Sequence, residues 1–199
     1  MNNTLLSTSL FVALSVITGT VLAADNTGNI NFNGELTDTT CKVDIEGQGP
    51  NALITLPTVS TNTLSQAGQV TGRTAFNMNL YDCNFYDDVV ITRANTIATV
   101  HGKVSAFFET GPTVDQAAGR LINMDVSATG ATFVQLQLLD GSNNFTPIKV
   151  GNTKQVTDTI YVNLKDQKAI LPYAVEYYAT GTTTAGKVNS SVVYTLQYK

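Results

Sequence analysis

The chain has 199 residues, enough for one domain with a sizeable core, and a formal net charge of −4. Charged residues make up only 13% and hydrophobic residues 43%, with no Trp; together with frequent Thr and Val, this composition favours an all-β exported protein. Because the balance is acidic and Lys and Arg nowhere cluster, we exclude nucleic acid as a partner.

The first 23 residues have the pattern of a secretory signal peptide. An apolar run from Leu5 to Val21 is interrupted by Ser and Thr, and small residues precede a cleavage site after Ala23 or Ala24. No Lys or Arg precedes the run, which departs from the usual pattern. A membrane anchor is the alternative, although the run is short for a spanning helix. We expect three segments: a signal peptide at 1–23, an N-terminal extension at 24–36 and a β-domain at 37–199.

The segment that follows the signal alternates as a strand with one buried face. Its inward positions are apolar or glycine, and the positions between them are Asn or Glu: Gly28, Ile30, Phe32, Gly34 and Leu36. Glycine weakens a strand, but it suits one that lies close against another backbone in a narrow groove. Chain termini usually fray unless something holds them. We therefore predict that this strand is donated to another molecule.

Two cysteines, Cys41 and Cys83, are an even number in an exported chain, which favours a disulfide between them. Two buried thiols or a metal site are the alternatives. One histidine and two cysteines cannot by themselves supply the four ligands of a zinc site.

The rest of the chain reads as short strands separated by turns, with no convincing helical period. The polar loop 60–72 has room for one short helical turn, and Asp140-Gly141 is a hairpin signal. This pattern predicts a single β-sandwich. The expected strands are 36–45, 52–59, 73–83, 89–92, 104–110, 132–139, 145–150, 157–164, 171–179 and 190–199.

The last expected strand, 190–199, predicts an open edge in the sandwich. Val192, Tyr194, Leu196 and Tyr198 alternate with more polar positions, and the sequence stops at Lys199. An immunoglobulin-like sandwich needs a further strand beside this one. Without it, a row of backbone groups goes unpaired and the core opens along a groove. We expect an incomplete immunoglobulin-like β-sandwich that lacks its last strand.

These features together resemble the pilin subunits of chaperone–usher fimbriae, most closely the type 1 major-subunit kind. The resemblance covers the whole chain after the signal peptide. Its motifs are the alternating extension, one early cysteine and a second in Asn79-Leu80-Tyr81-Asp82-Cys83, the 177–181 and 185–189 segments, and the terminal strand with Tyr194 and the penultimate Tyr198. Gly186, fourteenth from the C-terminus, matches the family's glycine at that spacing.

The resemblance implies a structural subunit of a surface fimbria that polymerises by donor-strand exchange and supports cell adhesion. Implied partners are neighbouring pilin subunits, a periplasmic chaperone and an outer-membrane usher, and the chain would pass through the periplasm to the cell surface. The extension would supply the donor strand. The acceptor groove and chaperone contact would comprise Gly186, Val192, Tyr194, Leu196, Tyr198 and the carboxylate of Lys199.

Features of an enzyme were sought and not found in the sequence. His101 is the only histidine, and no nucleophile-elbow glycine pattern surrounds any serine. The acidic residues lack calcium-loop spacing. We expect no catalytic site, no cofactor, no metal and no small-molecule substrate. The alternatives to a rod subunit are a secreted lectin-like binding module and a minor fimbrial adaptor.

Overall fold

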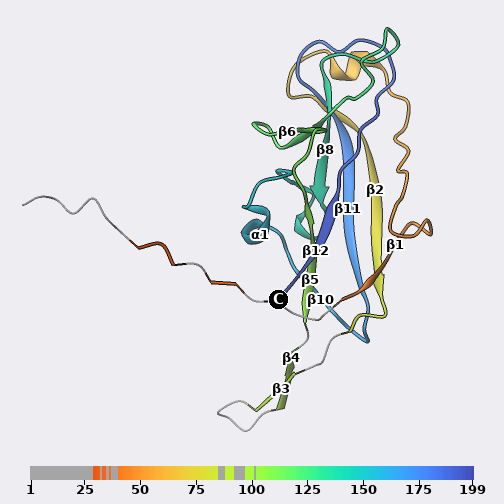
Figure 1. The fold of residues 1–199 in the computed structure, drawn as a ribbon. Helices are drawn as coiled ribbons and strands as arrows, with labels where there is room; N and C mark the ends of the chain where they lie inside the picture. Colours follow the sequence, from red (N-terminus) through yellow and green to blue (C-terminus); the bar gives the residue numbers. More distant parts are fainter. Residues whose placement is uncertain are drawn as a thin grey trace, which may run out of the picture. The chain divides into compact units, whose positions relative to one another are not determined.

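The structure is a computed structural model that describes residues 29–31, 33, 34, 36, 40–84, 88–91, 97–100 and 102–199. The expected signal peptide lies outside these residues. The chain divides into two units, Met1–Leu36 and Thr37–Lys199, and the strands described here belong to the second (Figure 1). Among the described residues, no helix has the length and apolar character needed to span a membrane.

The larger sheet runs in the order β1-β2-β11-β8-β7-β6, with β9 paired to β8. Its pairings are antiparallel throughout. Most of the inward positions along its three long central strands are buried, which is why the period of two was visible in the sequence. The strands are β1 Lys42–Ile45, β2 Val70–Tyr81, β6 Val114–Asp115, β7 Arg120–Ile122, β8 Val134–Asp140, β9 Thr146–Pro147 and β11 Ala169–Ala179.

A second sheet has the order β10-β5-β12 and is also antiparallel. Its strands are β10 Val162–Asn163, β5 Lys103–Phe108 and β12 Tyr194–Tyr198. A separate hairpin joins β3 Asp88–Ile91 to β4 Ile97–Val100. Short helices complete the fold: η1 Thr61–Leu64, η2 Gly141–Asn143 and α1 Gln155–Asp158.

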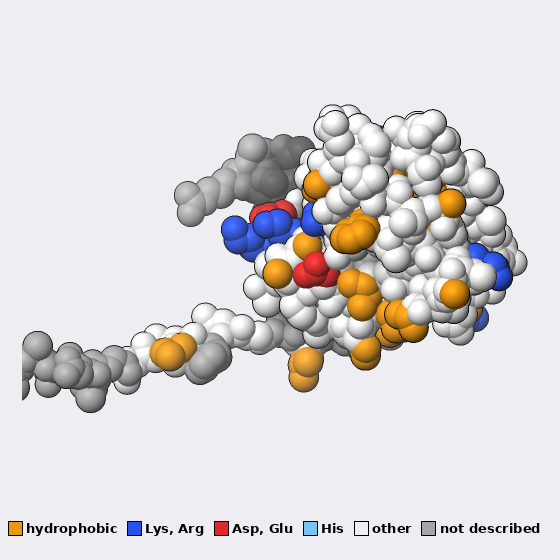
Figure 2. All heavy atoms as spheres, turned by 90° about the horizontal axis from the view of Figure 1, so that it is seen from above, with side chains coloured by type: hydrophobic (Ala, Val, Ile, Leu, Met, Phe, Trp, Pro, Cys, Tyr) orange, Lys and Arg blue, Asp and Glu red, His pale blue; other side chains and the backbone are white. Residues whose placement is uncertain are grey.

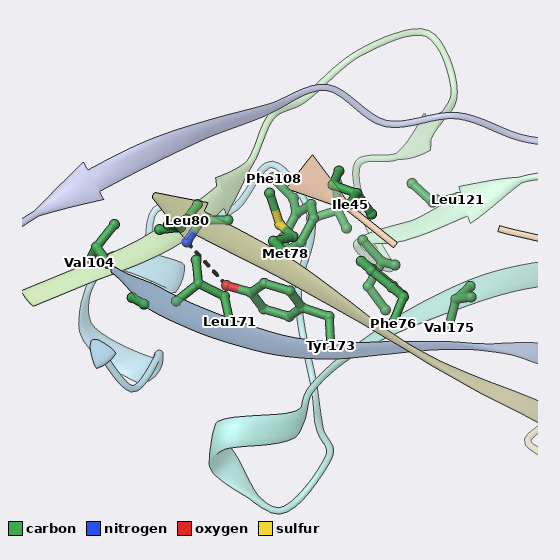
Figure 3. Packing of buried hydrophobic residues seen from close by; sticks show 14 of the residues in the cluster. Ile45, Phe76, Met78, Leu80, Val104, Phe108, Leu121, Leu171, Tyr173 and Val175 are labelled. Atoms are coloured by element: carbon green, nitrogen blue, oxygen red, sulfur yellow. Dashed lines mark hydrogen bonds between the residues drawn. The ribbon is translucent and has the colours of Figure 1, made fainter. Parts of the chain in front are cut away.

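The core lies between the two sheets. Met78 on β2, Leu171 on β11 and Val104 on β5 are almost fully buried. Tyr173 joins the layers, because its hydroxyl accepts a hydrogen bond of 3.1 Å from the Ala106 N–H on β5 and its ring meets Phe108 edge-on at 5.1 Å (Figure 3). Burial raises the pKa of this phenol. The structure therefore confirms the predicted β-sandwich.

The sandwich has two distinct ends. At the disulfide end, Lys42 pairs with Tyr81, Val104 pairs with Tyr198, and Cys41 is bonded to Cys83. At the opposite end, the termini of β8 and β11 meet and a bridge joins Gly130 to Lys187. The predicted disulfide is confirmed.

Removing the disulfide should lower the free energy of unfolding by about 4 kcal/mol, because the bond closes a loop with a sequence separation of 42. We expect this loss in a double Cys41→Ser, Cys83→Ser variant, measured by urea unfolding of the purified mature chain. Reductant should lower the stability of the unsubstituted chain toward the same value and leave the variant unchanged. Equal stability of the two chains in the absence of reductant would contradict the prediction.

Several expected strands differ in the structure. The 145–150 segment keeps only the two-residue β9. Residues 51–60 contain no assigned strand, although their burial alternates as in a strand. The 157–164 segment instead begins with the end of α1 and keeps only β10 as a strand. The reason is Gln155, whose buried side-chain amide accepts from the Phe108 N–H and donates to its carbonyl oxygen, both at 3.0 Å. This contact completes the hydrogen bonding of β5 and holds the chain in a helical turn.

Candidate strand-acceptor groove

The C-terminal strand β12 has a pairing partner on one side only. Lys199 exchanges two backbone hydrogen bonds with Lys103 of β5, at 2.8 and 2.7 Å. Since hydrogen-bonded and non-hydrogen-bonded pairs alternate in an antiparallel ladder, the backbone groups of Tyr194, Leu196 and Tyr198 point away from β5. In the described part of the chain, no strand pairs with this outer edge of β12.

The other wall of the groove is the extended segment 51–60. Ala52, Ile54 and Leu56 are half-buried and pack on the core, while the residues between them are exposed. This is the burial pattern of a strand, yet no ladder is assigned to the segment. We attribute the missing assignment to the missing neighbour, because strands are defined by backbone hydrogen bonds to an adjacent strand.

Between the two walls lies an open cavity of about 570 Å³. Val192 and Tyr194 line it on one side, and Ile54 on the other. Its floor consists of core side chains from four strands: Phe76, Met78, Phe108, Leu136, Leu138 and Val175. Several of these are seen in Figure 3. The cavity therefore lies directly above core side chains, which a strand placed between β12 and residues 51–60 would cover.

A second cavity, of about 700 Å³, lies toward the opposite end of the sandwich, between residues 58–64 and 183–189. The predicted groove residue Gly186 lines it, beside Lys187 and Val188. Position 186 needs glycine because the backbone of residues 129–131 lies very close to it. A Cβ at this position would lie 2.5 Å from the carbonyl carbon of Gly130 and 2.7 Å from the carbonyl oxygen of Thr129.

A Gly186→Ala substitution should therefore destabilise the chain by about 1–3 kcal/mol, because backbone must move to admit the methyl group. Gly111→Ala is the matched control, since a Cβ at Gly111 meets nothing within 4 Å. Urea unfolding of both mature variants measures the difference. A Gly186→Ala chain as stable as the control would show that the approach at Gly130 is not tight.

Two of the predicted tyrosines link β12 to the part of the chain that precedes the second wall. The Tyr194 hydroxyl donates to the carbonyl oxygen of Pro50 at 3.0 Å, and the Tyr198 hydroxyl accepts from the Cys41 N–H at 3.1 Å. Burial raises the pKa of both phenols, and at Tyr198 the hydrogen bond from Cys41 opposes that effect. Neutral hydroxyls therefore link β12 to residues 41–50.

The remaining predicted groove residues continue the inward face of β12. Leu196 and Tyr198 pack on the core beyond the cavity. The side chain of Lys199 donates to the Val156 carbonyl oxygen at 3.3 Å and lies 3.9 Å from the Tyr161 ring centroid. The sequence analysis expected a strand at 52–59 but did not assign this segment to the groove.

The predicted donor segment is described only in part. Ile30 is 79% exposed and Leu36 is fully exposed. Around Gly34, an added Cβ would meet nothing within 4 Å. Gly28 and Phe32 lie outside the described residues. Two large apolar side chains of this segment are thus open to solvent.

Comparison with known proteins shows which family has this sequence and fold. Residues 56–199 match the family model described as Type-1 fimbrial protein, A. The chain is 44% identical to the major fimbrial subunit SMF-1 of Stenotrophomonas maltophilia over 178 residues, covering 88% of this chain and 94% of the relative. It is 31% identical to the Escherichia coli type-1 fimbrial protein, A chain, covering 98% of this chain and 93% of the relative.

Among solved structures, the P pilus rod subunit PapA matches with a TM-score of 0.54 at 17% identity, covering 80% of this chain and 99% of that one. A chaperone–usher pilus structure matches with a TM-score of 0.51 at 19% identity, covering 89% of this chain and 98% of that one. These likenesses show a shared immunoglobulin-like pilin fold. The chain belongs to the type-1 fimbrial protein family. It is a structural subunit of a surface pilus, a class that is not enzymatic.

Proposed function

We propose that this subunit polymerises by donating residues 28–36 to the groove of a neighbouring subunit and by receiving the same segment from another. The observation that carries the proposal is the unpaired outer edge of β12, which faces the strand-like segment 51–60 across a cavity that opens onto the core. One added strand would pair with β12 and cover that core. Chaperone–pilin complexes are an established example of such strand addition.

The chemistry of the extension supports this pairing. Each of the apolar residues Ile30, Phe32 and Leu36 would contribute roughly 1.5–3 kcal/mol on burial. Gly28 and Gly34 would allow close approach where the groove is shallow, and the backbone ladder with β12 would add hydrogen bonds. On this proposal 24–36 is the donor extension and 37–199 the pilin domain, while 1–23 is the signal peptide that directs export.

Before assembly, the same groove needs a temporary occupant. A periplasmic chaperone would lend a strand to the groove and contact the Lys199 carboxylate with basic side chains. At an outer-membrane usher, the extension of the next subunit would then replace that strand. The exposed apolar wall supports this sequence of events, because a long unpaired edge beside an open core promotes aggregation. Among the alternatives, a minor adaptor would use the same groove, and the subunit's stoichiometry in purified fibres would distinguish it from a rod subunit.

Deletion of residues 24–36 from the mature chain tests the proposal. The truncated subunit keeps both groove walls, so it should still be captured by the chaperone and accept a donor strand. It should not complete another subunit, so chains should end wherever it is incorporated. Electron microscopy of surface fibres and gel analysis of unheated samples give the readout. Polymerisation of the truncated subunit alone would reject strand donation.

A further inference from the structure

We propose that consecutive subunits also make an end-to-end contact, in which the β3–β4 hairpin of one subunit packs on the exposed apolar loop 123–133 of the subunit that receives its extension. The inference rests on the proposed strand donation, because that donation decides which ends meet. The partner is a second copy of this chain.

The hairpin stands apart from the rest of the described fold. β3 and β4 pair from Asp88↔Val100 to Ile91↔Ile97 and form a two-stranded sheet of their own. An isolated two-stranded hairpin is marginally stable in water, and its free edges invite pairing or packing. Six of the eight strand residues are aliphatic: Val89, Val90, Ile91, Ile97, Ala98 and Val100. A partner surface would stabilise it.

The base of the hairpin lies where the extension joins the sandwich. The chain enters the hairpin just after Asn84, whose N–H donates to the carbonyl oxygen of Thr40 at 2.8 Å. It returns at Gly102, whose carbonyl oxygen accepts from the Leu164 N–H at 2.7 Å. The base of the hairpin and Thr40, which follows the extension in the sequence, therefore share the disulfide end of the sandwich, where Figure 1 also shows β3 and β4.

The opposite end presents apolar side chains in the loop between β7 and β8. Val126 is 94% exposed, Phe133 61% and Met124 43%. Phe133 has a φ of +57°, which is costly for a bulky side chain and is found where the surrounding structure enforces it. Its carbonyl oxygen accepts from the Thr180 N–H at 2.8 Å. The backbone thus holds an aromatic ring in solvent rather than in the core.

This loop is also fixed to the end of the groove. The Met124 N–H donates to the Asn189 carbonyl oxygen at 2.8 Å, and the Ala131 N–H donates to that of Lys187 at 2.9 Å. Viewed from this end, hydrophobic side chains are scattered among polar side chains and backbone, with Lys and Arg toward the margins (Figure 2). The loop therefore presents three large exposed apolar side chains, those of Met124, Val126 and Phe133, beside the second cavity.

The direction of the donated strand brings the two surfaces together. All pairings in the two main sheets are antiparallel, and an antiparallel addition to β12 continues that pattern. The extension would then enter the groove at the disulfide end and leave it beside loop 123–133. Residues 37–40 span about 14 Å at most, so they keep the donor's own disulfide end and hairpin close to that loop. Such a head-to-tail contact repeats along an open fibre.

Disulfide trapping tests the contact. Fibres of an Ala98→Cys, Val126→Cys variant should, on mild oxidation, yield covalent multimers that survive heating in detergent and disappear with reductant. The controls are each single substitution and Ala98→Cys paired with Thr146→Cys, since Thr146 lies on β9 and is exposed. Intact Cys41–Cys83 peptides must be verified by mass spectrometry. Fibres that form normally but give no more multimers than the controls would overturn the contact and leave strand donation standing.

A second measurement needs no added cysteine. Arg93 lies between β3 and β4 in the sequence, so trypsin can report whether the hairpin is covered. Cleavage there should be at least tenfold slower in unsubstituted fibres than in the unassembled mature subunit. A Phe133→Asn variant, whose new residue tolerates positive φ, should assemble and lose much of that protection. Equal cleavage in fibre and free subunit would refute the contact.

Discussion

Ile30→Asp should abolish incorporation of the subunit into fibres, whereas Asn31→Asp should assemble nearly as well as the unsubstituted chain. Ile30 is on the apolar face of the extension and is 79% exposed before assembly. In the neighbour's groove an aspartate would lose the burial energy of isoleucine and place an unpaired carboxylate against Phe76 or its neighbours. A loss of about 3 kcal/mol or more corresponds to at least a hundredfold weaker completion of the groove.

The two substitutions introduce the same side chain one residue apart, so they differ only in the face of the strand that carries the charge. Asn33→Asp provides a second control on the polar face. Strand exchange between purified subunits, followed on unheated gels, gives the rates. If the Ile30 and Asn31 variants assemble equally well, the alternation of this segment has no role in polymerisation.

Leu196→Asp should prevent capture of the subunit by the chaperone and lead to its degradation in the periplasm. Leu196 is half-buried against the core on the inward face of β12, opposite Ala106 of β5. A carboxylate there adds a charge to an apolar wall and costs several kcal/mol unless it is neutralised or paired. Only a small fraction of the Leu196→Asp subunit would then be bound to the chaperone.

Val193→Asp is the matched control for this substitution. Val193 is 69% exposed and precedes β12, and its carbonyl oxygen still accepts from the Glu109 N–H at 2.8 Å. Periplasmic levels of the two variants, with and without co-expressed chaperone, measure the effect. A Leu196→Asp subunit recovered at the level of the Val193→Asp subunit would count against a groove wall at β12.

Several features could be predicted from residue patterns because they are local. Period-two alternation predicted β12, and the pattern of short strands between turns predicted β2, β8 and β11. The cysteine count pointed to the disulfide between Cys41 and Cys83. The assignment of residues 157–164 as a strand was partly wrong, because the contact between Gln155 and Phe108 joins positions 47 residues apart and has no local signal.

The sequence by itself determined the class of fold, the disulfide and the membership in a family of pilus subunits. Only the tertiary structure decided that residues 52–56 form the wall facing β12, that four strands supply the floor between them, and that Gly186 is needed where its backbone approaches Gly130. Alternation tells which side chains of a strand face inward, but the neighbour across a hydrogen-bonding edge is set by contacts between distant segments. The sequence predicted that a strand is lacking beside β12, but which segment faces that edge becomes visible only when the other strands are in position.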